Sequence, residues 1–98
     1  MKHFDFYNAD LIVKLKKKTV TMPRDTSVFT LYLYRSSDDE LSYAITANDC
    51  DENFSMRCFD SFDDALTVFT LITENNVDAN SFGDIADDYY YSKKIYNM

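Results

Sequence analysis

Residues 28–48 read VFTLYLYRSSDDELSYAITAN, and this stretch decides the fold. Val28–Arg35 alternates apolar and polar side chains, and Leu41–Asn48 alternates again after a polar turn. A period of two residues is that of a β-strand with one buried face. If Leu31 pairs with Ile45, both segments present their apolar side chains on the same face of the sheet. The stretch therefore predicts a β-hairpin in a defined register.

Three further elements are predicted on the C-terminal side of the hairpin. Phe54–Phe59 alternates and predicts a third antiparallel strand, with Met56 on its buried face. Asp60–Asn76 has apolar residues at helical spacing and predicts a helix that covers the sheet, capped by Ser61. Ser81–Tyr96 predicts a second helix, capped by its first serine. The expected core consists of Phe29, Leu31, Ile45, Met56, Leu66 and Phe69.

The residues on the N-terminal side of the hairpin predict a helix followed by a short strand. Residues 8–18 begin with the good helix cap Asn8 and end in Lys16–Lys18, where cations are favoured by the helix dipole. A lysine run is also typical of a nucleic-acid-binding patch, but we favour a solvated helix end. Thr19–Met22 is rich in β-branched residues, and Pro23 limits it to an edge strand.

These elements predict an α+β fold in which a three- to four-stranded antiparallel sheet, arranged as a meander, has helices packed on one face. The 98 residues are expected to form a single domain, 1–98, and their 46% hydrophobic content disfavours disorder. The sequence has no apolar run of about 20 residues. It also lacks an apolar core near its start that would indicate a signal peptide. We expect a cytosolic protein in whichever cell makes it.

Charge is distributed unevenly along the chain. Ser36–Ser92 contains fourteen acidic residues and a single base, Arg57, although the whole chain has a formal charge of only −7. A surface of this kind would repel phosphates, so we expect no direct binding to nucleic acid. Such asymmetry carries information about partners and solubility and none about the fold.

The sequence disfavours an enzyme and predicts no catalytic, cofactor or metal site. Gly83 is the single glycine, whereas phosphate-binding loops and nucleophile elbows need several. The carboxylate pair Asp63-Asp64 lacks a neighbouring histidine, since His3 is the only one. Cys50 and Cys58 belong to opposite ends of one predicted hairpin, so we expect two free thiols.

Acidic and tyrosine side chains are the candidate partner-binding residues. A stiff acidic surface offers a DNA-binding groove a field comparable to that of DNA phosphates. Outward-facing tyrosines instead suit an adaptor that binds another protein without mimicry. A third interpretation is that the acids keep the domain soluble. The candidates are Asp38, Asp39, Glu40, Asp49, Asp51, Glu52, Asp84, Asp87, Asp88, Tyr32 and Tyr34.

Three passages carry a resemblance to a known family. Residues 8–12 (NADLI) begin the predicted lysine-ended helix, residues 27–33 (SVFTLYL) lead to the acidic turn at Asp38-Asp39, and residues 43–46 (YAIT) begin an acid-rich return. In these passages and in element order, residues 8–75 resemble small phage-encoded anti-CRISPR proteins, in particular the acidic type II-A inhibitors of Cas9. The tail from Asn80 has no counterpart.

The resemblance implies that the chain inhibits a nuclease by imitating DNA. In that family, acidic residues occupy the site where Cas9 reads the duplex beside its target. The matching acids here are, by implication, Asp38, Asp39, Glu40, Asp49, Asp51 and Glu52. Inhibitors of restriction enzymes and of uracil-DNA glycosylase use similar acidic surfaces, so these targets stay open, as does the oligomeric state.

Overall fold

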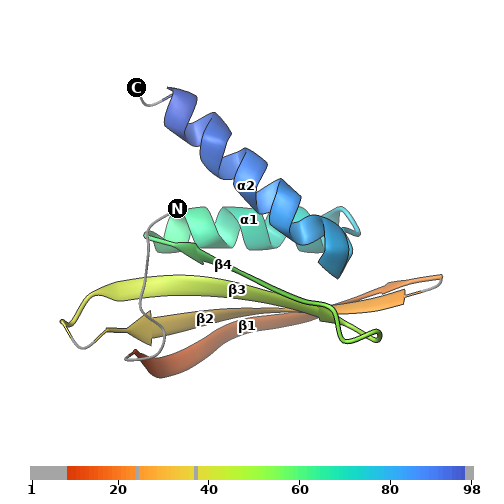
Figure 1. The fold of residues 1–98 in the computed structure, drawn as a ribbon, viewed down its shortest axis with the longest axis horizontal. Coiled ribbons are helices and arrows are strands. Elements are labelled where there is room, and N and C mark those ends of the chain that lie inside the picture. Colours follow the sequence, from red (N-terminus) through yellow and green to blue (C-terminus); the bar gives the residue numbers. More distant parts are fainter. Residues whose placement is uncertain (1–8, 24, 37, 97–98) are drawn as a thin grey trace.

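Four antiparallel strands form one sheet in the order β1-β2-β3-β4, and two helices follow in the chain (Figure 1). This computed structural model describes residues 9–23, 25–36 and 38–96. Both helices lie on the same side of the sheet (Figure 1). The predicted α+β class is therefore confirmed. The elements are β1 (Asp10–Met22), β2 (Asp25–Arg35), β3 (Leu41–Asp49), β4 (Phe54–Phe59), α1 (Phe62–Glu74) and α2 (Ala79–Tyr96).

The central hairpin of β2 and β3 has the predicted register. Leu31 lies opposite Ile45, and both side chains are fully buried on the face that the helices cover. β4 has the predicted bounds and pairs antiparallel with β3. Phe29 also faces the helices, whereas Tyr32 and Tyr34 alternate onto the opposite, open face of the sheet.

The predicted helix over residues 8–18 is wrong. The chain from Asp10 to Met22 is the strand β1, which pairs with β2 along its whole length. Leucine, isoleucine and valine at positions 11–13 suit a helical stripe. The β-branched isoleucine and valine also favour a strand, and β2 offers an edge with which this strand can pair. The predicted edge strand before Pro23 is confirmed, because β1 is an outer strand of the sheet. The expected cap, Asn8, lies outside the described residues.

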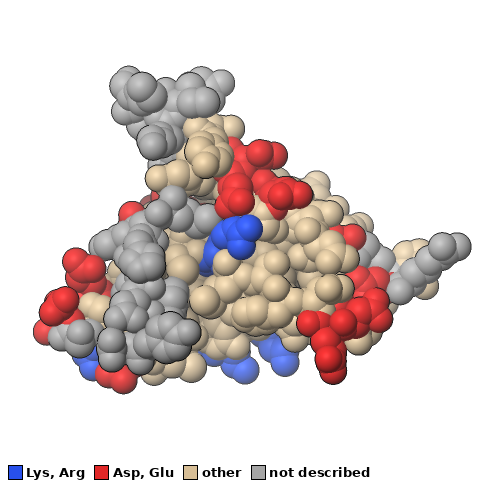
Figure 2. Space-filling model, viewed as in Figure 1, with Lys and Arg blue, Asp and Glu red and all other residues tan. Residues whose placement is uncertain are grey.

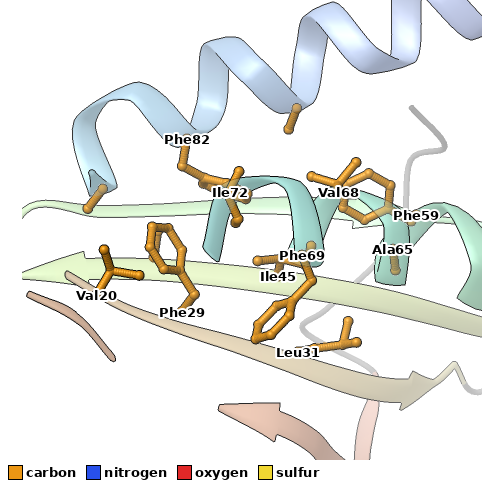
Figure 3. Packing of buried hydrophobic residues seen from close by; sticks show 13 residues of the cluster. Val20, Phe29, Leu31, Ile45, Phe59, Ala65, Val68, Phe69, Ile72 and Phe82 are labelled. Atoms are coloured by element: carbon orange, nitrogen blue, oxygen red, sulfur yellow. The ribbon is translucent and has the colours of Figure 1, made fainter. Parts of the chain in front are cut away.

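The core lies between the sheet and the two helices (Figure 3). Phe29, Leu31, Ile45 and Phe69 are buried there as predicted. Placing Met56 in this core is wrong, because β4 turns its other face to the helices. Leu66 is only half-buried, and the fully buried positions on the helices belong to Ala65, Val68, Ile72, Phe82 and Ala86.

The face of β4 follows from its register with β3. Arg57 lies opposite Ile45, so alternation directs Ser55, Arg57 and Phe59 toward the helices and Met56 toward the open face. Phe59 is accordingly buried, while Met56 is half-buried.

The first turn of each helix has a capping side chain. Ser61 caps α1 as predicted, since its Oγ accepts a hydrogen bond from Asp64 N at 3.1 Å. The prediction that Ser81 caps the second helix is wrong, because the carboxylate of Asp78 accepts from Ser81 N at 2.8 Å. Ala79 N donates to the buried Oγ of Ser27 at 3.0 Å, which fixes the start of α2 to β2.

Candidate protein-binding surfaces

The acidic candidates lie in three separate groups. Asp38, Asp39 and Glu40 form the β2–β3 turn, which we call the first acidic turn; the second acidic turn, β3–β4, contains Asp49, Asp51 and Glu52. The two turns lie at opposite ends of β3, whose nine residues span about 30 Å at ~3.3 Å per residue. The third group, Asp84, Asp87 and Asp88, belongs to α2. Figure 2 shows acidic side chains at both ends of the sheet and on α2. The structure thus divides the predicted acidic surface into three.

The first acidic turn is held by hydrogen bonds to a serine at its base. Ser36 Oγ accepts from Asp38 N at 3.2 Å and from Glu40 N at 3.1 Å, and Ser36 N donates to Glu40 O at 2.8 Å. Asp39 has φ of 61°, which aspartate tolerates better than most residues. Arg35 approaches Asp39 at 4.0 Å, an exposed pair that adds less than about 1 kcal/mol. These hydrogen bonds hold the described backbone positions of the turn, whose acids are exposed.

The second acidic turn is held by one of its own acids. The Asp49 carboxylate accepts from Asp51 N and Asn53 N, each at 3.0 Å, and from Asn53 Nδ2 at 2.9 Å. The hydrogen bond from the Asn53 side chain is the main cause that lowers the pKa of Asp49. Asp49 thus shapes the turn, and Asp51 and Glu52 are its exposed acids.

On α2, one of the three acids is used to hold the helix on the sheet. Arg57 Nε donates to Asp87 Oδ1 at 3.0 Å, and Arg57 Nη2 donates to Asp87 Oδ2 at 3.4 Å. The guanidinium packs against the helix at Gly83, where a Cβ atom would lie 2.6 Å from Nη2. Asp84 and Asp88 remain exposed. Sequence reasoning missed Arg57, although a lone base among fourteen acids is itself a signal of a fixed ion pair.

The two candidate tyrosines lie together on the open face of the sheet. The ring centroids of Tyr32 and Tyr34 are 6.0 Å apart. Burial, followed by the neighbouring Tyr32, raises the pKa of Tyr34. Both line an open groove of about 460 Å³, whose apolar walls also include Leu11, Val28, Phe54 and Met56. Met56, which was predicted to lie in the core, instead lines this groove on the open face of the sheet.

Both cysteines are free, as predicted from their positions at opposite ends of the β3–β4 hairpin. Cys50 is exposed, and its Sγ donates to Asp25 Oδ1 at 3.5 Å. Cys58 lies on the open face of β4, where burial raises its pKa.

Within the described ranges, no group of three or more histidine, cysteine or acidic residues is placed to hold a metal ion. In the same part of the chain, no helix is both long and apolar enough to cross a bilayer. No family model matches this chain, and neither a curated protein nor a solved structure matches it.

Proposed function

We propose that the protein is a phage or mobile-element inhibitor that occupies the nucleic-acid groove of a bacterial defence nuclease such as Cas9, in the host cytoplasm. It acts by binding, as a DNA mimic, and has no catalytic activity of its own. The observation that supports this proposal is that both acidic turns are internally hydrogen-bonded. These hydrogen bonds hold the described backbone of each turn without the help of a partner.

The spacing of the turns suits a groove that follows a DNA backbone. Phosphates of one strand recur every ~3.4 Å of duplex axis, so the span of about 30 Å along β3 corresponds to about nine phosphates. The two turns then engage lysines or arginines near the two ends of such a groove. Asp84 and Asp88, exposed on α2, add negative charge outside the two turns.

Hydrogen bonds within the turns reduce the entropy that is lost on binding. A flexible acidic loop loses conformational entropy when a partner orders it, and the hydrogen bonds within these turns reduce that loss. Exposed carboxylates also steer the approach of a basic partner, so the association rate should fall as salt rises. Glu52, in the second acidic turn, has φ 64°, which is a sparsely populated conformation for a non-glycine residue.

Competition with DNA tests the proposal. A Cas9–guide complex, a restriction endonuclease and uracil-DNA glycosylase are each titrated with the protein and with their own duplex substrate. We expect inhibition of at least one of these enzymes that weakens as duplex concentration or salt rises. The triple variant Asp38→Asn/Asp39→Asn/Glu40→Gln should lose most of this inhibition while remaining folded.

A matched control separates specific contacts from net charge. The triple variant Asp60→Asn/Asp63→Asn/Glu74→Gln removes the same charge from exposed positions outside the acidic turns. It should keep most of the inhibition. Equal loss in both variants, or a target that binds the protein and its DNA together, contradicts mimicry.

The groove at Tyr32 and Tyr34 favours a second function, that of an adaptor that binds another protein. Tyrosine contacts in a partly apolar groove are typical of interface centres. In this case Tyr32→Ala/Tyr34→Ala abolishes binding, while neutralising the acidic turns and raising the salt have little effect. The two sets of variants therefore distinguish the functions.

A further inference from the structure

β1 leaves one edge of the sheet unpaired in the described part of the chain. It is an outer strand, so the only described strand that pairs with it is β2. Lys16–Met22 pairs with β2 without a register shift, and this regular stretch directs alternate backbone N–H and C=O groups away from the sheet. Such a row is a template for another strand.

Positive charge lies on both faces of this edge. Lys16 and Lys18 lie opposite Leu31 and Phe29, on the face that the helices cover, whereas Lys17 lies opposite Thr30 on the open face. All three lysines are exposed, and none forms an ion pair with another described residue. Figure 2 shows basic side chains along the lower side of the molecule, where β1 lies in Figure 1.

Each face of the edge also adjoins a groove. Between β1 and α1 lies a groove of about 360 Å³ whose walls include Lys16, Lys18, Phe69, Thr73 and Glu74. On the opposite face, the groove of Tyr32 and Tyr34 extends to Lys17 and Leu11. Side chains of an added strand alternate between the two faces, so both rows have space beside β1.

The first half of β1 adds an apolar contact. Its aliphatic residues are 37–53% exposed, which is a large apolar area for one strand. The register shifts in this half, so it suits side-chain contact better than a regular ladder. The residues concerned are Leu11, Ile12, Val13 and Leu15.

We propose that the edge of β1 binds an extended acidic segment of a partner protein as a fifth strand. The segment pairs with the backbone of Lys16–Thr21, places carboxylates beside the lysines and contacts Leu11–Leu15 with an aliphatic side chain. Edge lysines discourage pairing with most strands, and the same charges select an acidic one. A second copy is a poorer occupant, because pairing two β1 edges adds the lysines of both copies to one sheet.

Two blocked nine-residue peptides test this proposal, one alternating glutamate with valine and the other lysine with valine. We expect the glutamate peptide to bind, by fluorescence anisotropy at low salt, and to slow amide hydrogen exchange at residues 16–21. The lysine peptide should not bind. A glutamate peptide methylated on alternate backbone nitrogens keeps its charge but cannot complete a ladder, so its binding should be lost.

Charge exchange tests the two lysines, and a single charge reversal on β2 serves as the control. Lys16→Glu/Lys18→Glu should weaken binding of the glutamate peptide roughly tenfold or more and allow the lysine peptide to bind. Arg35→Glu, a single reversal on β2 opposite Asp10 and away from Lys16–Thr21, should change the affinity much less.

Several results overturn the proposal. These are failure of the glutamate peptide to bind, binding without protection of residues 16–21, and equal binding of the methylated peptide. Tighter binding of a single-stranded oligonucleotide at the same edge assigns the lysines to nucleic acid instead. A dimer that Lys16→Glu/Lys18→Glu abolishes assigns the edge to a second copy. None of these results bears on the acidic turns, so the proposed inhibitor function stands or fails separately.

Discussion

Arg57 of β4 and Asp87 of α2 form a two-pronged ion pair, with the guanidinium resting on the helix backbone at Gly83. The Arg57 side chain is 31% exposed and that of Asp87 is 40% exposed, so solvent screens the attraction. The position of the only glycine in the chain is explained by this contact, because any side chain at residue 83 meets the guanidinium.

Gly83→Ala tests whether the steric contact with Arg57 cancels the helix propensity that alanine adds at residue 83. Alanine favours a helix by about 1 kcal/mol over glycine, but here its Cβ displaces Arg57 from Asp87. We expect no gain in the free energy of unfolding in the wild type and a gain of about 0.5–1 kcal/mol in an Arg57→Ala background. Urea unfolding of the four variants measures this, and equal gains in both backgrounds would refute the contact.

Phe82→Ala and Met56→Ala test the two faces of the sheet. Phe82 is fully buried, and its ring lies edge-on to that of Phe29 with the ring centroids 6.0 Å apart. Its truncation should therefore lower the free energy of unfolding by about 3–5 kcal/mol. Met56 is half-buried on the open face, so its truncation should cost about 1 kcal/mol. Denaturant midpoints decide the matter, and the reverse order would mean that β4 faces the other way.

Glu52→Gly should stabilise the protein. The left-handed conformation costs a residue with a side chain about 1–2 kcal/mol, whereas glycine adopts it freely and loses about 0.5–1 kcal/mol of backbone entropy. A net gain of roughly 0.5–1 kcal/mol is expected in thermal unfolding. Asp51→Gly is the matched control in the same turn, where no positive φ applies, and it should destabilise.

The pKa of Asp49 gives a signed dependence of stability on pH. Its carboxylate is favoured in the folded state, so its contribution is fully present above the unfolded pKa, near 3.8. The contribution is lost as pH falls from about 4 through the lowered folded pKa. Asp49→Asn should therefore flatten the loss of stability below pH 4. Carboxyl NMR titration provides a direct check, and a pKa at or above 3.8 contradicts the hydrogen bonding.

The two thiols should react at different rates. Burial raises the pKa of Cys58, so less thiolate is present at pH 8, and the side chain is partly covered. Cys50 is exposed. Labelling by a disulfide reagent should show a fast phase that Cys50→Ser removes and a slow phase that Cys58→Ser removes. The opposite assignment would contradict the register of β4.

Local sequence determined the hairpin and α1, because alternation and a capping serine act over a few residues. The strand β1 was missed because residues 11–15 fit both periods, and the unpaired edge of β2 decides between them. The alternation in β4 predicts two faces but does not indicate which of them is buried. The buried face is set by the register of β4 with β3, and Arg57 on that face pairs with Asp87. The separation of the acidic turns follows from the sequence, since successive turns of a meander lie at opposite ends of the sheet, whereas the prediction of one acidic surface ignores this separation.

Because side chains alternate along a strand, β3 can change length without exchanging its buried and open faces only in steps of two residues. Each step moves one acidic turn by about 6.6 Å relative to the other. The distance between the charged ends is therefore adjustable only in coarse increments, each close to two phosphates of a DNA strand. If the two acidic turns bind a target as proposed, smaller adjustments of the distance between their charges must come from the side chains of the turns.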